Sequence, residues 1–347
     1  MCKSDYVSTE NMLQDFRGIC RYTTSEKIAG IEFEKQNLLL ANIRPYLKKV
    51  WFANFSGAAS TDVLVLKATT IVPGFLKHII ANESFISYVM SAVKGSKMPR
   101  GDKSHILNYT LGMPCHDEQQ KIADFLSLVD ERIEKQRQLV EVLKRYKRGL
   151  FLLLFDGKQQ NNILSQIIEY GKAGGTPTST NKNYYSGTIP FLSISDMTAQ
   201  GKFLRNTEKH ISELGLKNST AWLVPANSLI ISMYASYGLV SINTIPITTS
   251  QAMFSIIPKD ETDTEYLYYY LSYLSTTGYY DKMVSTGTQA NLNAEKVKNI
   301  PIYFPSKEER TKIKVILKTF DEMEDAENRK LETLLDIKSG LLQQMFI

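Results

Sequence analysis

The chain has 347 residues, of which 43% are hydrophobic and 22% are charged, and its formal net charge is +5. That length allows two or three domains with ordinary cores, and the small positive excess suits an anionic partner such as nucleic acid without establishing one. The longest apolar run, "GLFLLLF", is far shorter than the roughly 20 residues of a membrane span, and the N-terminus is not a signal peptide. The cysteines have the spacing of neither a disulfide framework nor a zinc site, so we expect a cytoplasmic protein.

The first segment, residues 1–113, mixes strand-like and helical stretches and forms the first predicted globular domain. Basic side chains gather in "RPYLKKVWF" and again in "KGSKMPRGDKSH". Lys and Arg suit contacts with DNA phosphates, and Arg also suits base edges. The alternative is that both stretches are simply solvated loops. The candidate DNA-binding residues of this segment are Arg44, Lys48, Lys49, Lys97, Arg100 and Lys103.

The central segment, residues 114–156, predicts one long helix. Its apolar residues recur at alternating steps of four and three, which is typical of a coiled-coil seam, and Gln136 and Lys147 interrupt that seam. A helix of this length needs a partner that buries its apolar stripe. The residues expected to pack between helices are Ile122, Leu126, Val129, Ile133, Val140, Leu143 and Leu150.

The next segment, residues 157–304, is the second predicted globular domain. Its glycine-rich stretch "GKAGGTPTST" lacks the Lys that would reach a phosphate, so we interpret it as a loop between strands. The acidic stretch "PKDETDTEYL" predicts a solvated turn that enters a helix. Polar and aromatic loop residues again suit contacts with DNA. The candidates here are Lys172, Thr176, Thr178, Lys182, Tyr234, Tyr237, Thr288, Gln289 and Asn291.

The last segment, residues 305–347, repeats the central helix. "PCHDEQQKIADFLSLVDE" at Pro114 returns as "PSKEERTKIKVILKTFDE" at Pro305, and Asp130 and Lys147 return as Asp321 and Lys338 at the same offset. The corresponding apolar stripe predicts helix packing, with Ile316, Met323 and Ile337 widening it. The packing residues expected on this helix are Ile313, Leu317, Phe320, Leu331, Leu334 and Leu341.

The repeat extends into the globular segments, where "SGAASTDVLVL" resembles "PITTSQAMFSI" and "GFLKHIIANESFISYVM" pairs with "EYLYYYLSYLSTTGYYD". We therefore predict two copies of an α/β (α+β) domain, joined by two long antiparallel coiled-coil helices with pseudo-twofold symmetry. That arrangement predicts a dumbbell with a globular domain at each end.

The first copy is shorter than the second. In the second copy the stretch "LSQIIEYGKAGGTPTSTNKNYYSGTIP" precedes "FLSISDM". In the first copy the counterpart of "FLSISDM" is "YVSTENM", which begins five residues from the N-terminus. We expect the first domain to lack an opening strand and loop, to be less stable than the second, and to read DNA poorly. Hydrogen exchange with equal protection in both domains would count against this expectation.

Motifs of catalysis were sought and not found. The sequence has no GxxxxGK[ST] phosphate loop, no HExxH, no GxSxG, no paired CxxC and no NPPY-like tetrapeptide. No nuclease-like carboxylate cluster or metal site is recognisable. The sequence therefore predicts no catalytic residues and no cofactor on this chain.

The duplicated helix, together with "GSKMPRGD", "GGTPTST", "IPFLSISDM" and "GTQANL", resembles the specificity subunit of Type I restriction-modification enzymes along essentially the whole chain. The resemblance implies a non-catalytic subunit that binds double-stranded DNA, with each globular domain recognising one half of a split target. It also implies that the helices set the spacing of the halves and dock two modification (methyltransferase) subunits. S-adenosylmethionine, ATP and Mg²⁺ are then expected on the modification and motor-nuclease (restriction) subunits.

Other interpretations stay open from the sequence alone. The chain could be a truncated or silent recombination cassette, or an adaptor whose coiled coil joins two proteins without reading DNA. An adaptor would have no reason to keep basic and polar loops at matching places in both copies. An unfamiliar methyltransferase or nuclease is a third possibility, against which the missing motifs speak. The sequence does not give the DNA target.

Overall fold

The computed structural model describes residues 6–20, 30–95, 98–234, 236–284 and 292–346. The chain forms two compact units, one of Met1–Leu139 with Glu327–Ile347 and the other of Val140–Ala326. Each unit combines a globular domain with half of each long helix. Because this division cuts both helices, the expected division into four consecutive segments stays a prediction. None of the helices in the described part of the chain has the length and apolar character that a membrane crossing requires.

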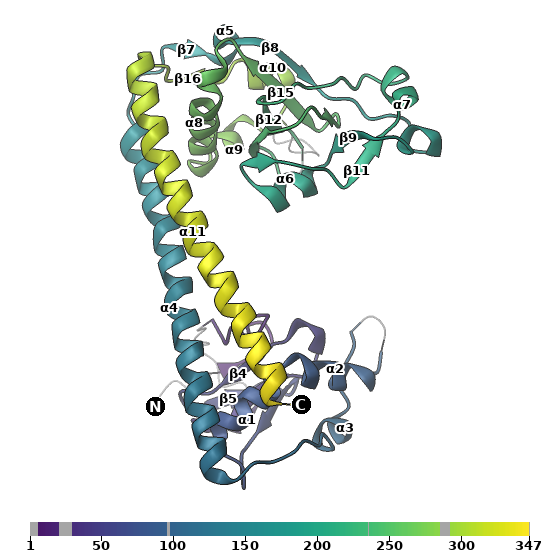
Figure 1. Ribbon diagram of the computed structural model, residues 1–347, viewed down its shortest axis with the longest axis vertical. Coiled ribbons are helices and arrows are strands. Elements are labelled where there is room, and N and C mark those ends of the chain that lie inside the picture. Colours follow the sequence, from purple (N-terminus) through teal and green to yellow (C-terminus); the bar gives the residue numbers. More distant parts are fainter. Residues whose placement is uncertain (1–5, 21–29, 96–97, 235, 285–291, 347) are drawn as a thin grey trace. The chain divides into compact units, whose positions relative to one another are not determined.

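Two long helices, α4 (His116–Phe155) and α11 (Lys307–Met345), carry the repeated sequence (Figure 1). In the first unit Asp130 contacts Lys338 while Gln136 contacts Glu327, so residue numbers rise along α4 as they fall along α11. The expected antiparallel pairing is therefore confirmed. Gln136 and Glu327 occupy equivalent positions of the repeat, and their side chains meet at 2.7 Å. In an antiparallel pair of repeated helices, equivalent positions face each other only at the midpoint, so this contact marks it.

The seam between the helices is largely buried, as the alternating steps of four and three require. Six of the expected packing residues are buried, and the other seven are partly buried. The expectation that Ile316, Met323 and Ile337 widen the stripe is wrong, because their exposed fractions are 40%, 46% and 51%. The buried six are Leu126, Ile133, Val140, Leu143, Ile313 and Leu317, and the partly buried seven are Ile122, Val129, Leu150, Phe320, Leu331, Leu334 and Leu341.

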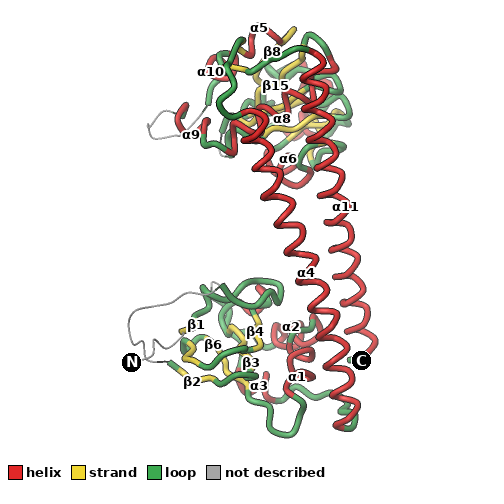
Figure 2. The backbone as a smooth tube through the Cα atoms, turned by 90° about the vertical axis from the view of Figure 1, so that its left-hand side faces the viewer, coloured by secondary structure: helices red, strands yellow, loops and turns green. Residues whose placement is uncertain are grey.

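The globular part of the first unit contains two small sheets and three short α-helices among its described residues (Figure 2). One sheet has the strand order β4-β3-β6 and the other β1-β5-β2. Helix α1 packs on the first sheet through Phe75 and Ile79. The elements are β1 (Tyr6–Val7), β2 (Ile31–Phe33), β3 (Leu38–Ala41), η1 (Pro45–Leu47), β4 (Val50–Phe52), β5 (Gly57–Ala59), β6 (Val63–Leu66), α1 (Pro73–Ile80), α2 (Glu83–Ser91) and α3 (Lys103–Leu107).

The globular part of the second unit is built around a sheet of order β10-β13-β12-β15-β8, beside the smaller sheets β11-β9-β14 and β16-β7. The aromatic helix α8 covers the larger sheet with buried tyrosines such as Tyr266 and Tyr270.

The elements of the second unit, apart from its halves of the long helices, are β7 (Asn162–Ile163), α5 (Leu164–Ile167), β8 (Ile168–Ala173), η2 (Lys182–Tyr185), β9 (Ile189–Leu192), α6 (Ile194–Gln200), β10 (Phe203–Leu204), β11 (Lys209–Ile211), α7 (Glu213–Lys217), β12 (Leu229–Ser232), β13 (Val240–Asn243), β14 (Thr248–Thr249), β15 (Met253–Pro258), η3 (Glu261–Asp263), α8 (Thr264–Thr276), α9 (Tyr279–Met283), α10 (Ala294–Lys298) and β16 (Pro301–Ile302).

The internal repeat is visible in the register of the two main sheets. Leu39 of β3 lies opposite Val65 of β6, and Ile230 of β12 lies opposite Ser255 of β15. Ile230 lies 191 residues after Leu39, and Ser255 lies 190 residues after Val65. Because a slip of one residue would turn every side chain to the other face of the sheet, the shared register shows that both units bury equivalent faces.

The two main sheets differ at their edges. In the second unit β15 lies between β12 and β8, whereas in the first unit the equivalent strand β6 is the last strand of its sheet. Among the described residues of the first unit β6 pairs with β3 alone, and the expectation of a missing opening strand stays a prediction. Whether the first domain is less stable stays a prediction.

Candidate nucleic-acid interface

Two neighbouring loops of the first unit hold most of its candidate DNA-binding residues. One loop follows β3 and the other precedes α3, and their backbones are joined because Gly101 N–H donates to Asn42 O at 3.1 Å. Arg44 N–H also donates to Pro99 O at 2.7 Å, and Arg44 has a left-handed φ of 51°. The structure therefore brings Arg44 and Arg100 together on adjacent loops.

The candidate side chains of this loop pair differ in availability. Arg44 and Lys103 are exposed, and exposed Arg100 makes an ion pair of 3.1 Å with Asp62. Lys48 and Lys49 are instead engaged within the unit: Lys48 pairs with Glu83 at 2.6 Å, and Lys49 donates to the Thr9 carbonyl at 2.7 Å. Lys97 lies outside the described residues.

The second unit repeats this loop pair with different side chains. Leu292 N–H donates to Met233 O at 2.9 Å, and both residues lie 191 positions after Gly101 and Asn42. Tyr234 is exposed on the first of these loops, while the Tyr237 hydroxyl donates to Asp281 at 2.6 Å. This hydrogen bond raises the pKa of Tyr237. The candidates Thr288, Gln289 and Asn291 lie outside the described residues.

The glycine-rich loop after β8 is fixed by close packing. A Cβ atom at Gly174 would lie 2.2 Å from Thr249 O, and one at Gly175 would lie 2.2 Å from Ala221 N. These glycines therefore allow backbones to approach closely, as expected of a loop between strands. Four candidate residues in and around this loop are exposed: Lys172 on β8, Thr176 and Thr178 on the loop, and Lys182 in η2.

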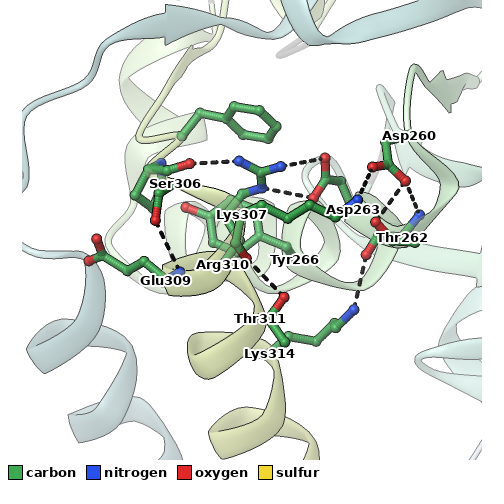
Figure 3. A network of polar contacts seen from close by, with 12 residues as sticks. Asp260, Thr262, Asp263, Tyr266, Ser306, Lys307, Glu309, Arg310, Thr311 and Lys314 are labelled. Atoms are coloured by element: carbon green, nitrogen blue, oxygen red, sulfur yellow. Dashed lines mark hydrogen bonds and ion pairs between the residues drawn. The ribbon is translucent and has the colours of Figure 1, made fainter.

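The start of α11 is fixed to its domain by a buried ion pair (Figure 3). The Arg310 guanidinium donates to both carboxylate oxygens of Asp263, at 2.7 and 3.0 Å, and to the Pro305 carbonyl at 2.6 Å. It also stacks on the Phe304 ring at 3.9 Å. The expectation of a solvated acidic turn is therefore wrong for Asp263, which is only 6% exposed because the helix end covers it.

The start of α4 has an equivalent joint that is uncharged. Gln119 occupies the position of Arg310 in the repeat, and its side chain accepts from Val72 N–H and donates to the Pro114 carbonyl, both at 3.0 Å. Val72 and Pro114 lie 191 residues before Asp263 and Pro305. Both long helices are thus tied to their domains through the same three positions, with different chemistry.

A second repeated contact is a partly buried ion pair between the long helices. Asp130 pairs with Lys338 at 2.7 Å in the first unit, and Asp321 pairs with Lys147 at 2.6 Å in the second. Each carboxylate also contacts a Lys of its own globular domain, Lys77 in the first unit and Lys202 at 3.0 Å in the second.

The lysines keep both carboxylates ionised despite burial. Burial opposes ionisation of Asp130, but Lys338 and Lys77 outweigh it and hold the pKa of Asp130 below its ordinary value. Burial likewise opposes ionisation of Asp321, whose pKa is lowered by Lys147, by the hydroxyl of Tyr269 and by Lys202. Sequence reasoning did not assign these residues a role, although the signal was present: Lys147 interrupts the apolar seam and is nevertheless kept in the repeat.

Comparison with known proteins identifies the class of protein to which this chain belongs. A family model described as "Type I restriction modification DNA specificity domain" matches residues 3–145 and 160–335. The protein is thus a DNA-recognition component without a catalytic role, and the chain belongs to the family of Type I restriction modification DNA specificity domains.

Named relatives agree with this assignment. The chain is 26% identical to the Type I restriction enzyme HindI specificity subunit of Haemophilus influenzae, across 96% of this chain and 92% of that protein. It is 30% identical to the MjaIX specificity subunit of Methanocaldococcus jannaschii, across 53% of this chain and 43% of that protein. The adaptor and cassette interpretations are therefore not favoured.

Solved structures share the fold at lower identity. The S subunit of a Type I restriction-modification system from M. genitalium has a TM-score of 0.58 at 16% identity, covering 100% of this chain and 93% of that one. A chain from a structure on the assembly and conformational transition of a type I R-M system has a TM-score of 0.57 at 16% identity, covering 98% and 90%.

Replacing Arg310 tests the charged joint. Arg310→Met leaves Asp263 buried without a cation, so we expect the free energy of unfolding of the second unit to fall by about 3–5 kcal/mol. Gln119→Ala, the matched change in the first unit, removes uncharged hydrogen bonds and is expected to cost about 1–3 kcal/mol. Denaturant unfolding, combined with hydrogen exchange of the α1 and α8 amides, measures the loss of unfolding free energy in each variant. Equal losses in the two variants would contradict the difference between a charged and an uncharged joint.

Acid is expected to weaken the helix pair through Asp130 and Asp321. Because their folded-state pKa values lie below the ordinary 3.8, their stabilisation is fully present above that value and is lost as the pH falls through the folded-state pKa. Unfolding curves from about pH 7 to about pH 3 should show this loss in the wild type and a smaller loss in Asp321→Asn. Asp124→Asn, at an exposed position of α4, is the control and should follow the wild type; an Asp321→Asn curve parallel to the wild type would refute this origin.

Proposed function

We propose that the chain reads a split DNA target, with the loop pair of each unit contacting one half of it. The observation that carries this proposal is the duplication of the loop pair with its backbone hydrogen bond, Gly101 to Asn42 and Leu292 to Met233. The scaffold is repeated while the exposed side chains differ, Arg44 and Arg100 in one unit and Tyr234 in the other. Different side chains on one scaffold suit two different half-sites, because base-edge contacts specify sequence.

We propose further that the helix pair docks two modification subunits. Support comes from exposed apolar residues on both long helices, some of which stand directly before a residue of the seam, as Phe125 does before Leu126 and Ile316 before Leu317. Two of these positions are equivalent in the repeat: Phe125 with Ile316, and Tyr146 with Ile337. Equivalent exposed apolar positions suit two copies of one partner. The exposed apolar residues are Phe125, Leu128, Leu139, Tyr146, Leu152 and Leu153 on α4, and Val315, Ile316, Met323, Leu335, Ile337 and Met345 on α11.

In this proposal the chemistry belongs to the partner subunits. S-adenosylmethionine would serve adenine methylation on the modification subunits, and ATP with Mg²⁺ would serve the motor-nuclease subunits. The chain itself would supply only sequence recognition and docking surfaces.

Methylome sequencing tests the proposal. A host that expresses the chain with its modification subunit should show a new methylated, split motif that is absent without the chain. Arg44→Ala should weaken discrimination at one half-site, by about 1–3 kcal/mol if the contact is bidentate, and Tyr234→Ala should affect the other half.

Two outcomes would contradict it. If no motif appears although the subunits co-purify, the chain joins proteins without reading DNA. If Arg44→Ala and Tyr234→Ala alter the same half-site, the loop pairs do not read separate halves.

A further inference from the structure

A short segment of the second unit covers two edges of its domain at once. This segment, Asn161–Ala173, is called the strap here and contains β7, α5 and β8. Its β8 pairs antiparallel with β15, and its β7 pairs antiparallel with β16 (Figure 1). Asn161 also exchanges side-chain hydrogen bonds with the backbone of Phe304, at 2.8 and 2.9 Å.

The strap closes the core of the second unit. Leu164 is fully buried, and Ile167 and Ile168 are 8% and 6% exposed. They belong to the same apolar cluster as Ile256 of β15 and Ile302 of β16, both of which are fully buried. The strap therefore supplies strand partners and apolar side chains together.

The first unit has the receiving surface without a described strap. Its equivalents of β15 and β16 are β6 and the stretch Tyr109–Met113, and both contribute to one apolar cluster. Leu66 and Leu111 occupy the positions of Ile256 and Ile302 but are only partly buried, and Met113, in the position of Phe304, is 49% exposed. Among the described residues, β6 pairs only with β3.

We propose that this face of the first unit is a docking site for a separate strap-like peptide, added as a strand beside β6. An edge strand offers a row of unpaired N–H and C=O groups that an extended segment can pair with. The internal repeat defines the chemistry of the occupant: an extended end that pairs with Thr110–Leu111, a short turn that buries two apolar side chains, and a second extended end along β6. Recruitment of such a segment would complete the first recognition domain.

The two edges together favour a strap over a second copy of this chain. Pairing β6 with β6 of a second copy would supply a strand for one edge, whereas the strap of the second unit pairs with both β15 and β16. The strap of a second copy is held in its own unit, where Leu164 N–H donates to Ile300 O at 2.9 Å and Lys259 N–H donates to Ile167 O at 3.2 Å. A free segment of the same pattern can satisfy both edges of the first unit.

Hydrogen exchange on the full chain tests the proposal, with a synthetic peptide of the sequence Asn161–Gly175 as the probe. At a peptide concentration of about ten times its Kd, the amides of β6 and of Tyr109–Met113 should exchange about tenfold more slowly, and the effect should saturate. The control peptide carries Ile167→Asp and Ile168→Asp, which keep its length and remove the apolar contacts, and it should protect neither stretch. The amides of β15 in the same sample give the reference for a strand with two neighbours.

Three results would overturn the proposal. The first is that the β6 amides exchange as slowly as those of β15 before peptide is added, which would mean that the edge is already covered. The second is that neither β6 nor Tyr109–Met113 gains protection at any peptide concentration. The third is that protection rises with protein concentration and does not depend on the peptide, which would assign the edge to a second copy.

Discussion

The structure depends on one partly buried ion pair that occurs twice, Asp130 with Lys338 and Asp321 with Lys147. Each pair crosses between α4 and α11 and is joined by a further Lys from the globular domain of its unit. A carboxylate that loses its cation away from full solvent is destabilising, so a helix that slipped along its partner would be penalised at both sites. We infer that the ion pairs fix the register of the helix pair, which the apolar seam alone would leave less defined.

The fixed register supports function because each domain is attached to its helices by specific contacts. The joint at Arg310, and the uncharged joint at Gln119, attach the start of each long helix to a domain. Loops that read DNA need a rigid base, because errors of about 1 Å in side-chain position weaken recognition. In each unit the loop pair proposed to read DNA, the joint and the ion pair belong to the same compact unit. The repeat keeps that structure and changes the side chains presented to the ligand.

The sequence predicted the long helices, their antiparallel pairing and the family, because a repeat at a constant offset leaves a direct trace in the residues. It did not predict the burial of Asp263 or the exposure of Ile316, since both depend on which surface packs against the helix. The sequence also did not predict which loop side chains are free to contact a ligand. Arg44 is exposed, whereas Lys48 forms an ion pair with Glu83 of α2. The roles of Lys147 and Lys338 could have been found, because a charge that interrupts an apolar seam in both copies indicates a partner.

The most direct measurement is a pair of double-mutant cycles, Asp130→Asn with Lys338→Met and Asp321→Asn with Lys147→Met, read by denaturant unfolding. The exposed pair Glu131 and Lys135, 2.6 Å apart on one face of α4, is the reference. The account predicts coupling energies of similar size in both interhelical pairs, each well above the roughly 0.5 kcal/mol of an exposed helical pair. Coupling no larger than that of the exposed pair at either site would contradict the claim that one repeated ion pair fixes the helix register.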